Sequence, residues 1–354
     1  MALTSYGVGD TLAAKRWARL LNAEALQATE IAPLIGTGAD SIIQRKDEPK
    51  KEKGDRVTVG LRMQLFGDGV SEGQTLEGRE ESLTTYSDNL LLQELAHAVR
   101  VKGDNTIDNQ RILFNTRTEA KAGLRDWFAK RYSLGFFLHV CGYTGANYTH
   151  RSMTVDRTSA VYNLGNTITA PSTNRKVFAA AGSGESNTTD QALESDDTFD
   201  LRLIDYAKEL ARTAASPIRP VNIEGGEFYV CYLHPYQVVD LRTNTDTGQW
   251  MDFSRAAYTG RGKSSPLFDG SLGVYNGVIL RESEDVTPGV NSSTSASIST
   301  VRRAVFLGAQ AALIGFGSEF NEGQGSYKWV NFFGPFVARV ANENRVDSGN
   351  LLAA

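Results

Sequence analysis

Apolar side chains recur at close to helical spacing between Thr116 and Cys141, which predicts one long helix with a buried face. The apolar positions are Ala120, Leu124, Trp127, Phe128, Leu134, Leu138 and Cys141. Thr116 and Glu119 have the spacing of a capping box, in which a hydroxyl and a carboxylate satisfy backbone N–H groups of the first turn. Gly142 is typical of a helix C-terminus. At ~1.5 Å per residue, the helix would span about 39 Å and cross a whole domain.

Apolar and polar side chains alternate from Arg56 to Leu65, which predicts a β-strand. The glycine-rich segment from Gly67 to Gly73 predicts a turn, and polar residues then lead the chain back to Tyr86. The tip of this predicted hairpin contains Gly67, Asp68, Gly69, Val70, Glu72, Leu76, Glu77, Arg79, Glu80 and Glu81. A two-stranded hairpin is marginally stable in water, and no obvious sheet precedes it, so we expect it to lie against something else.

The N-terminal region predicts an arm on a charged connector. Residues 10–30 have the apolar spacing of a helix, and Pro33 lies just beyond its end. The segment from Ile43 to Arg56 mixes lysine, arginine, aspartate and glutamate. We therefore expect this segment to be solvated and to stay outside the core.

The remainder of the chain predicts shorter elements. Between Tyr143 and Asp197 we expect short strands or loops held by their neighbours, because a structureless stretch of this length is unusual in a compact domain. The other predicted elements are a helix from Phe199 to Ala215, a strand from Phe228 to Leu233, a helix from Tyr236 to Arg242, a strand from Leu272 to Leu280, a loop from Pro288 to Thr300, an apolar segment from Val301 to Gly315 and a strand from Trp329 to Val340. The pattern is that of an α+β protein.

Composition narrows the class of protein. A chain of 354 residues with 41% hydrophobic residues suggests two domains or one elaborated domain. The net charge of −4 argues against a dedicated nucleic-acid binder, which needs a basic face. Cys141 and Cys231 are predicted to be small buried hydrophobes of a reducing compartment. No apolar run has the length of a membrane span and no signal peptide is evident, so we expect a soluble chain made in the cytosol.

Candidate catalytic motifs are incomplete. The segment from Gly260 to Ser264 resembles the end of a phosphate-binding loop, but Ala257 stands where the first glycine is needed, and Pro266 interrupts the helix that should follow. The four histidines are scattered and lack zinc-ligand spacing. We therefore predict no catalytic, cofactor-binding or metal-binding residues and no enzymatic activity. A nucleotide-dependent hydrolase using Lys263 stays as an alternative, as does a phage tail or receptor-binding β protein.

Three segments carry a family resemblance: Gly54 to Leu65, Thr75 to Gly78 with Glu80 and Glu81, and Thr85 to Asp88 followed by His97 to Arg100. Together with the order of the predicted elements, they resemble the major capsid proteins of tailed phages with the Hong Kong 97-type fold. Within that fold they are most similar to the coat proteins of N-four-like podophages. Segments 274–278 and 307–311 are similar to later parts of the same family.

The resemblance implies that the chain has the five parts of the Hong Kong 97-type fold. It implies an N-terminal arm (1–53), an extended loop (54–89), a peripheral domain (90–200) that contains the spine helix, an axial domain (mostly 201–325), and a closing strand with a C-terminal tail (326–354). The spine-helix residues singled out are Thr116, Glu119, Leu124, Trp127 and Phe128. Because lysine is absent between Lys53 and Lys102, the lysine crosslink that the fold's type member forms from its extended loop is not expected.

The resemblance also implies the partners of the chain. It implies that copies self-assemble as hexamers and pentamers of an icosahedral phage head, with each hairpin tip contacting a neighbouring subunit. A portal protein would complete the head, with scaffolding or decoration proteins as further components. The shell would enclose double-stranded DNA without sequence-specific binding and without a membrane, after assembly in the host cytoplasm.

Overall fold

The computed structural model describes most of the chain. The described residues are 24, 27–38, 40–46, 56–62, 65, 67–75, 77–83, 85–91, 95, 97, 99, 115–179, 187–195, 197–214, 217–223, 225–244, 272–315, 336–339 and 351–353. Most of the predicted first helix, Leu76 of the hairpin tip and the glycine-rich segment around Lys263 lie outside these residues.

The long helix α3 (Thr116–Val140) has nearly the predicted bounds. It begins at Thr116, so the carbonyl of Asn115 accepts the first N–H groups, from Thr118 at 3.1 Å and Glu119 at 3.2 Å. The predicted capping box at Thr116 and Glu119 is therefore wrong, because Thr116 is already inside the first turn and does not precede the helix. The predicted stop is confirmed. Gly142 has φ +58°, its N–H donates to the His139 carbonyl, and the following N–H donates to the Leu138 carbonyl, as in a Schellman motif.

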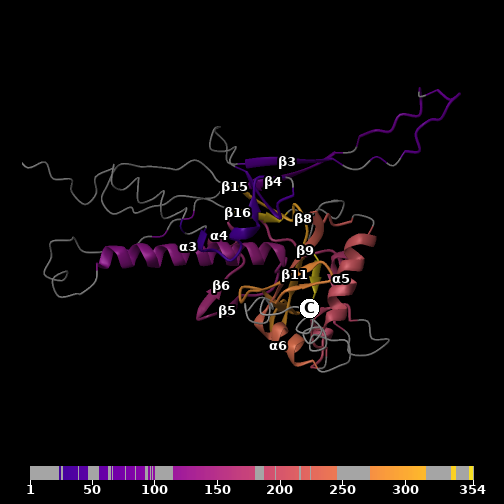
Figure 1. The fold of residues 1–354 in the computed structure, drawn as a ribbon. Coiled ribbons are helices and arrows are strands. Elements are labelled where there is room, and N and C mark those ends of the chain that lie inside the picture. Colours follow the sequence, from indigo (N-terminus) through magenta and orange to yellow (C-terminus); the bar gives the residue numbers. More distant parts are fainter. Residues whose placement is uncertain are drawn as a thin grey trace, which may run out of the picture.

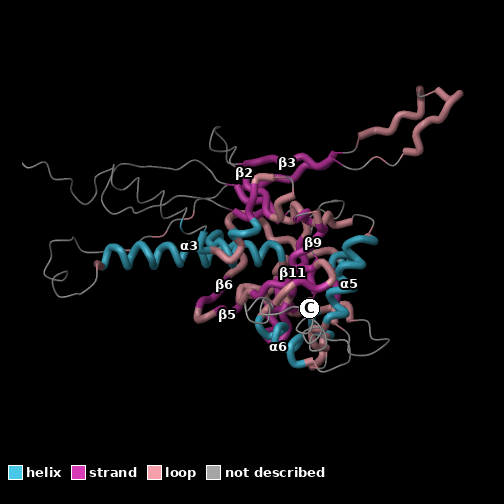
Figure 2. The backbone as a smooth tube through the Cα atoms, in the orientation of Figure 1, coloured by secondary structure: helices cyan, strands magenta, loops and turns pink. Residues whose placement is uncertain are grey.

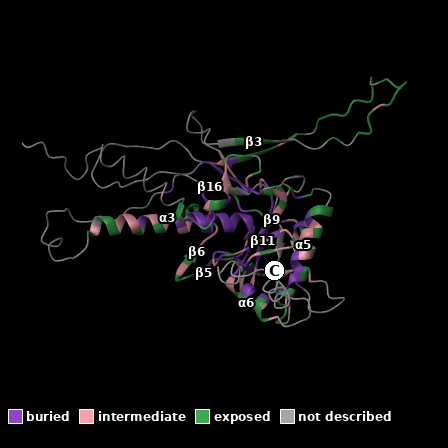
Figure 3. Cartoon of the chain, viewed as in Figure 1, coloured by how far each residue is buried: buried purple, intermediate pink, exposed green. Residues whose placement is uncertain are grey.

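Burial along α3 differs from a single apolar stripe (Figure 3). Every residue from Tyr132 to Cys141 is buried. The polar His139 is among them, at 0% exposure. The N-terminal half is only partly covered, with Leu124 and Phe128 as its buried residues on the predicted face. The pattern reflects two apolar clusters that pack on opposite sides of the second half of the helix. A periodicity argument assumes one covered face and so misses this enclosure.

A seven-stranded sheet forms the centre of the body, with strand order β10-β11-β9-β14-β17-β7 and β8 paired to β9. Its strands are β7 (Lys176–Val177), β8 (Val221–Ile223), β9 (Gly226–Leu233), β10 (Val274–Tyr275), β11 (Val278–Glu282), β14 (Ala304–Leu307) and β17 (Leu351–Ala353). Strand β9 confirms the prediction of a strand apolar on both faces. Tyr229, Cys231 and Leu233 pack in one core cluster, and Val230 and Tyr232 pack in the other.

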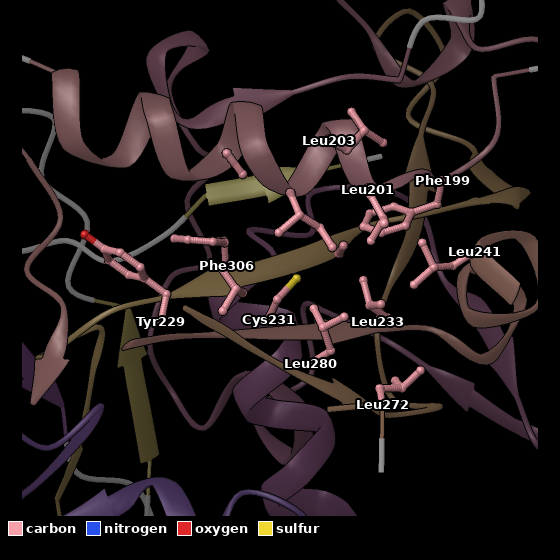
Figure 4. Close-up of a cluster of buried hydrophobic side chains, with 14 of the residues drawn as sticks. Phe199, Leu201, Leu203, Tyr229, Cys231, Leu233, Leu241, Leu272, Leu280 and Phe306 are labelled. Carbon is pink, nitrogen blue, oxygen red and sulfur yellow. The ribbon is translucent and has the colours of Figure 1, made fainter. Parts of the chain in front are cut away.

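The helices α5 (Leu201–Thr213) and α6 (Pro235–Thr243) cover one face of this sheet, and α3 packs on the other (Figures 1 and 4). Both shorter helices have side-chain caps. Asp200 accepts the Leu203 N–H at 3.1 Å, and His234 forms a capping box with Gln237. Two predicted helices are thus confirmed, and the sheet is buried on both sides.

A second sheet has the order β1-β2-β15-β16 and places part of the N-terminal region in the core. Its strands are β1 (Ile35–Gly36), β2 (Ile43–Lys46), β15 (Ala312–Gly315) and β16 (Phe336–Arg339). The prediction that the charged segment is solvated from Ile43 onward is wrong at its start, since Ile43 is 0% exposed and pairs with Ala312. A partner this distant in sequence leaves no local signal.

Three predicted segments contain hairpins or short elements, of which Figure 2 labels β5, β6 and β11. The predicted strand 272–280 is the β10–β11 hairpin, whose turn residues Asn276 and Gly277 have φ of 45° and 75°, as a type I′ turn requires. The predicted loop 288–300 contains β12 (Pro288–Val290) and most of β13 (Ser297–Arg302). Between 143 and 197 lie β5 (Tyr148–His150), β6 (Met153–Val155), α4 (Ala160–Asn163), strand β7 and the 3-10 turns Thr173–Arg175 and Asp190–Ala192. A further 3-10 turn, Ala32–Leu34, directly precedes β1.

We expect Phe128→Ala to destabilise the subunit by ~3–5 kcal/mol through lost transfer energy and a residual cavity, because Phe128 is 3% exposed. Trp127→Ala should cost less. Trp127 is half-buried and lies against the ring of His97, at 4.3 Å between centroids, and under the Arg131 guanidinium. Chemical denaturation of both variants checks the order. A larger loss for Trp127→Ala would show that this end of α3 is covered more fully than described.

Candidate subunit-contact hairpin

The predicted hairpin is present. Strands β3 (Arg56–Arg62) and β4 (Thr85–Leu91) pair antiparallel, with Arg56 opposite Leu91 and Arg62 opposite Thr85. The ladder ends three residues before the predicted end of the first strand. Beyond it the two arms continue to a tip that projects far from the body (Figures 1 and 2). This projection leaves the tip without support from the described body of its own chain.

The described tip residues are almost all exposed. Val70 is the one that is half-covered, while Leu65 and Leu83 at the neck of the tip are 56% and 55% exposed. Residues 63–84 contain five acidic residues and one arginine, a net charge of −4 that equals the charge of the whole chain. The tip therefore presents a charged surface with a few apolar side chains, and contributes little to the core of its own subunit.

Hydrogen bonds within the tip fix part of its shape. The Glu81 carboxylate accepts the Gly67 N–H at 2.7 Å, and the Glu80 carboxylate accepts the Gly78 N–H at 2.8 Å. The Arg79 guanidinium donates to the Gln74 side chain at 2.8 Å. Three of the charged residues predicted to face a neighbour are thus engaged within the tip. The remaining tip acids, Asp68, Glu72 and Glu77, are exposed.

A buried ion pair joins the C-terminus of α3 to the rest of the body. Arg303 donates from Nε at 2.9 Å and from one terminal nitrogen at 2.6 Å to Asp190, and both side chains are less than a tenth exposed. Its other terminal nitrogen donates to the carbonyls of Cys141 and Gly142, at 3.2 and 3.4 Å. Arg303 therefore satisfies carbonyl groups that the helix end leaves without intrahelical partners. The spacing of residues in the sequence gave no sign of this contact.

A second buried polar cluster centres on Asp285, which is 1% exposed. Its carboxylate pairs with Lys130 of α3 and lies 3.1 Å from His150 Nε2. Burial would raise the pKa of the Asp285 carboxyl, but these neighbours outweigh burial and hold the pKa below its ordinary value. Nearby, burial raises the pKa of Glu30, whose carboxylate accepts a hydrogen bond from Ser283.

We expect Asp285→Asn to destabilise the subunit at neutral pH by on the order of 3 kcal/mol, because Lys130 would lose a buried partner. The lowered pKa means that the carboxylate contribution is present above about pH 4 and is lost as pH falls through the folded-state pKa. Denaturation of parent and variant at pH 7 and at pH 3 measures this. Equal differences at both pH values would contradict the assignment.

The histidines serve structural contacts. His139 donates from Nε2 to the Asn163 carbonyl at 2.9 Å, and His234 caps α6. Burial, followed by the nearby charges of Arg302 and His150, lowers the pKa of His234 to about 4. Within the described ranges, no group of three histidine, cysteine or acidic side chains is placed to hold a metal ion. No helix in the same ranges has the length and apolar character needed to cross a membrane.

Comparison with known proteins shows the family to which the chain belongs. The family model described as phage capsid protein matches residues 5–333. The chain belongs to the phage capsid protein family. The chain is 28% identical over 325 residues to the major capsid protein of Pseudomonas phage KPP25. The aligned region covers 89% of this chain and 82% of that protein.

Solved capsid structures share the fold. The capsid protein of Ralstonia phage GP4 matches with a TM-score of 0.70 at 24% identity, over 90% of this chain and 88% of that chain. The capsid of cyanophage Pam1 matches with a TM-score of 0.63 at 20% identity, over 93% and 92% of the two chains. The predicted α+β capsid fold is confirmed, and the chain is a structural component of the phage head. The N-four-like subfamily stays a prediction.

Proposed function

We propose that this chain is the major capsid subunit of a tailed phage, and that its β3–β4 hairpin joins neighbouring copies in the shell. The observation that carries the proposal is the hairpin itself, which projects from the body and carries an exposed, internally hydrogen-bonded tip. Many modest contacts of this kind, closed by symmetry, give a stable shell through multivalency. In this proposal, the tip residues predicted to contact a neighbouring subunit form that contact.

The finer partners belong to the same proposal. Hexamers and pentamers of the chain would form the icosahedral head in the host cytoplasm, with a portal protein at one vertex and scaffolding or decoration proteins as further components. The shell would hold double-stranded DNA without reading its sequence, which is consistent with the net charge of −4. The predicted domain boundaries also stay a proposal, although Ile31, Leu34, Ile42 and Ile43 of the arm pack in the body.

Electron microscopy of the purified full chain tests the proposal against its alternatives. Closed icosahedral shells of one size are the expected result. Trimeric rods would favour the tail or receptor-binding alternative, and unassembled monomers that turn over nucleotide would favour the hydrolase. Either of the last two results would overturn the capsid assignment for this chain.

The Lys263→Ala variant tests the hydrolase alternative directly. We expect the variant to form shells with the yield and DNA content of the parent, because the surrounding segment lacks the glycine and the helix that a phosphate-binding loop needs. The measurement is particle yield together with ATP binding and hydrolysis. A nucleotide activity that is present in the parent and absent from the variant would show that Lys263 binds phosphate.

A further inference from the structure

The side chain of Asn166 holds the base of the β3–β4 hairpin at the end of β4. Its Oδ1 accepts the Leu91 N–H at 2.9 Å, and its Nδ2 donates to the Leu91 carbonyl at 3.1 Å. Leu91 is the last residue of β4, so the amide occupies the outer edge of the strand as another strand would. Next to it, Leu90 is 1% exposed. The hairpin is thus fixed to the body where β4 ends.

Asn166 is itself positioned by the spine helix. The carbonyl of Asn163 accepts both the Asn166 N–H, at 3.0 Å, and the Nε2–H of the fully buried His139 of α3, at 2.9 Å. The Asn166 Nδ2 also donates to the Leu164 carbonyl at 3.1 Å. A short chain of hydrogen bonds therefore runs from α3 through the 160–166 segment to the end of β4.

A glycine in the middle of α3 lets this segment approach. A Cβ built on Gly135 would lie 3.1 Å from the Tyr162 carbonyl oxygen and 3.2 Å from a Leu164 methyl group. Such contacts are tighter than a side chain normally accepts, and one of the two atoms belongs to the backbone. Glycine is less favourable than alanine inside a helix, because it loses more conformational freedom on folding. Here it allows the 160–166 segment to lie directly on the helix.

We propose that Asn166 is a positioning residue, which sets the direction in which the β3–β4 hairpin leaves the body and so aims the tip at the neighbouring subunit. The inference rests on the proposed function of the hairpin. A hairpin anchored at one end by a bidentate amide is preorganised, so less conformational freedom is lost when its tip meets the next copy. Loss of the amide should therefore impair assembly without removing any atom of the contact surface.

The experiment measures the direction of the hairpin in the full chain. Spin labels on Ser82→Cys at the tip and Thr213→Cys at the end of α5 report one intramolecular distance, because both positions are exposed. Cys141 and Cys231 are buried, and burial raises the pKa of the Cys231 thiol to about 12, so neither should be labelled. Labelled copies are diluted with unlabelled copies and measured before shells form, and shell yield is then counted by electron microscopy.

We expect a narrow distance distribution for the parent, and a broadened or shifted distribution with a loss of shell yield for Asn166→Ala. Asn166→Asp should lie between them, because a carboxylate still accepts the Leu91 N–H but has no hydrogen to donate to the Leu91 carbonyl. The matched control is Thr58→Val, which removes the Thr58–Asn89 hydrogen bond inside the hairpin and leaves its base intact.

Three results would overturn the inference. They are an unchanged distribution for Asn166→Ala, a broadened distribution with parental shell yield, or an equal effect of Thr58→Val. If Asn166→Ala does not fold by circular dichroism, Asn166→Asp decides by the same criteria. The outcome is separate from that of the proposed function, since absence of shells from the parent chain would contradict the capsid proposal alone.

Discussion

Replacing residues 67–78 with a two-residue Asn-Gly turn is expected to yield a folded subunit that fails to close stable shells. The β3–β4 ladder ends at Arg62 and Thr85, and the described tip residues beyond it lie outside the core. The replaced residues therefore contribute little to subunit stability. Their exposed charges are individually worth about 0–1 kcal/mol in a contact, but the same contact recurs on every copy. Circular dichroism, sedimentation and negative-stain imaging measure folding and assembly together.

A charge variant provides the matched control. Glu72→Gln with Glu77→Gln keeps the length and glycines of the tip and removes two of its exposed acids. We expect this variant to form fewer shells than the parent, and its shells to depend less on ionic strength, because salt screens exposed charges. Normal shells from the shortened chain would rule out a bridging role for the tip. An unfolded shortened chain would instead place the tip in the intramolecular core.

Arg303→Ala should strongly lower the stability of the subunit itself, by ~3–5 kcal/mol. The change removes the guanidinium partner of the buried Asp190 and the hydrogen bonds that Arg303 donates to the Cys141 and Gly142 carbonyls. Arg212→Ala is the control. Arg212 pairs with Glu227 at 2.6 Å, but both side chains are at least half exposed, so its loss should cost ~0–1 kcal/mol.

Denaturant titration of the two arginine variants shows whether the loss of stability depends on the burial of the ion pair or only on its presence. Equal midpoints for Arg303→Ala and Arg212→Ala would mean that water or another cation reaches Asp190. Assembly adds a second readout. Because Arg303 is buried in the subunit, any loss of shells from its variant should follow the loss of folded protein, whereas a tip variant should lose shells at constant folded protein.

The parts of the fold that the sequence predicts well are those whose signals are local. The β3–β4 hairpin follows from alternation between Arg56 and Leu65, and the end of α3 follows from Gly142. The type I′ turn at Asn276 and Gly277 was equally readable, since Asn-Gly between apolar residues is a strong hairpin signal. The prediction of a single strand over 272–280 overlooks this turn, because apolar residues flank it on both sides.

The parts that were missed depend on partners far away in the chain. Nothing near Ile43 indicates that it pairs with Ala312, and nothing near Arg303 indicates that it caps a helix ending at Val140. Asn166 lies in a stretch rich in Asn, Ser, Thr and Gly, where one amide among many gives no signal. The tip residues were predicted as a contact set, but only the structure shows which of their charges are already engaged.

The parallel pairing of β2 with β15 bears on how the chain is made in the infected cell. Residues 43–46 emerge early in translation, yet their partners at 312–315 follow about 270 residues later, which at ~5–20 residues per second is roughly 15–55 s. During that time β1 is the one described neighbour in its sheet with which β2 can pair, and Ile43 lacks its partner Ala312. Nascent or prematurely terminated chains cannot complete this core. A chain that ends before residue 312 therefore lacks the β15 partner of β2, so its Ile43 cannot reach the pairing that it has in the complete fold.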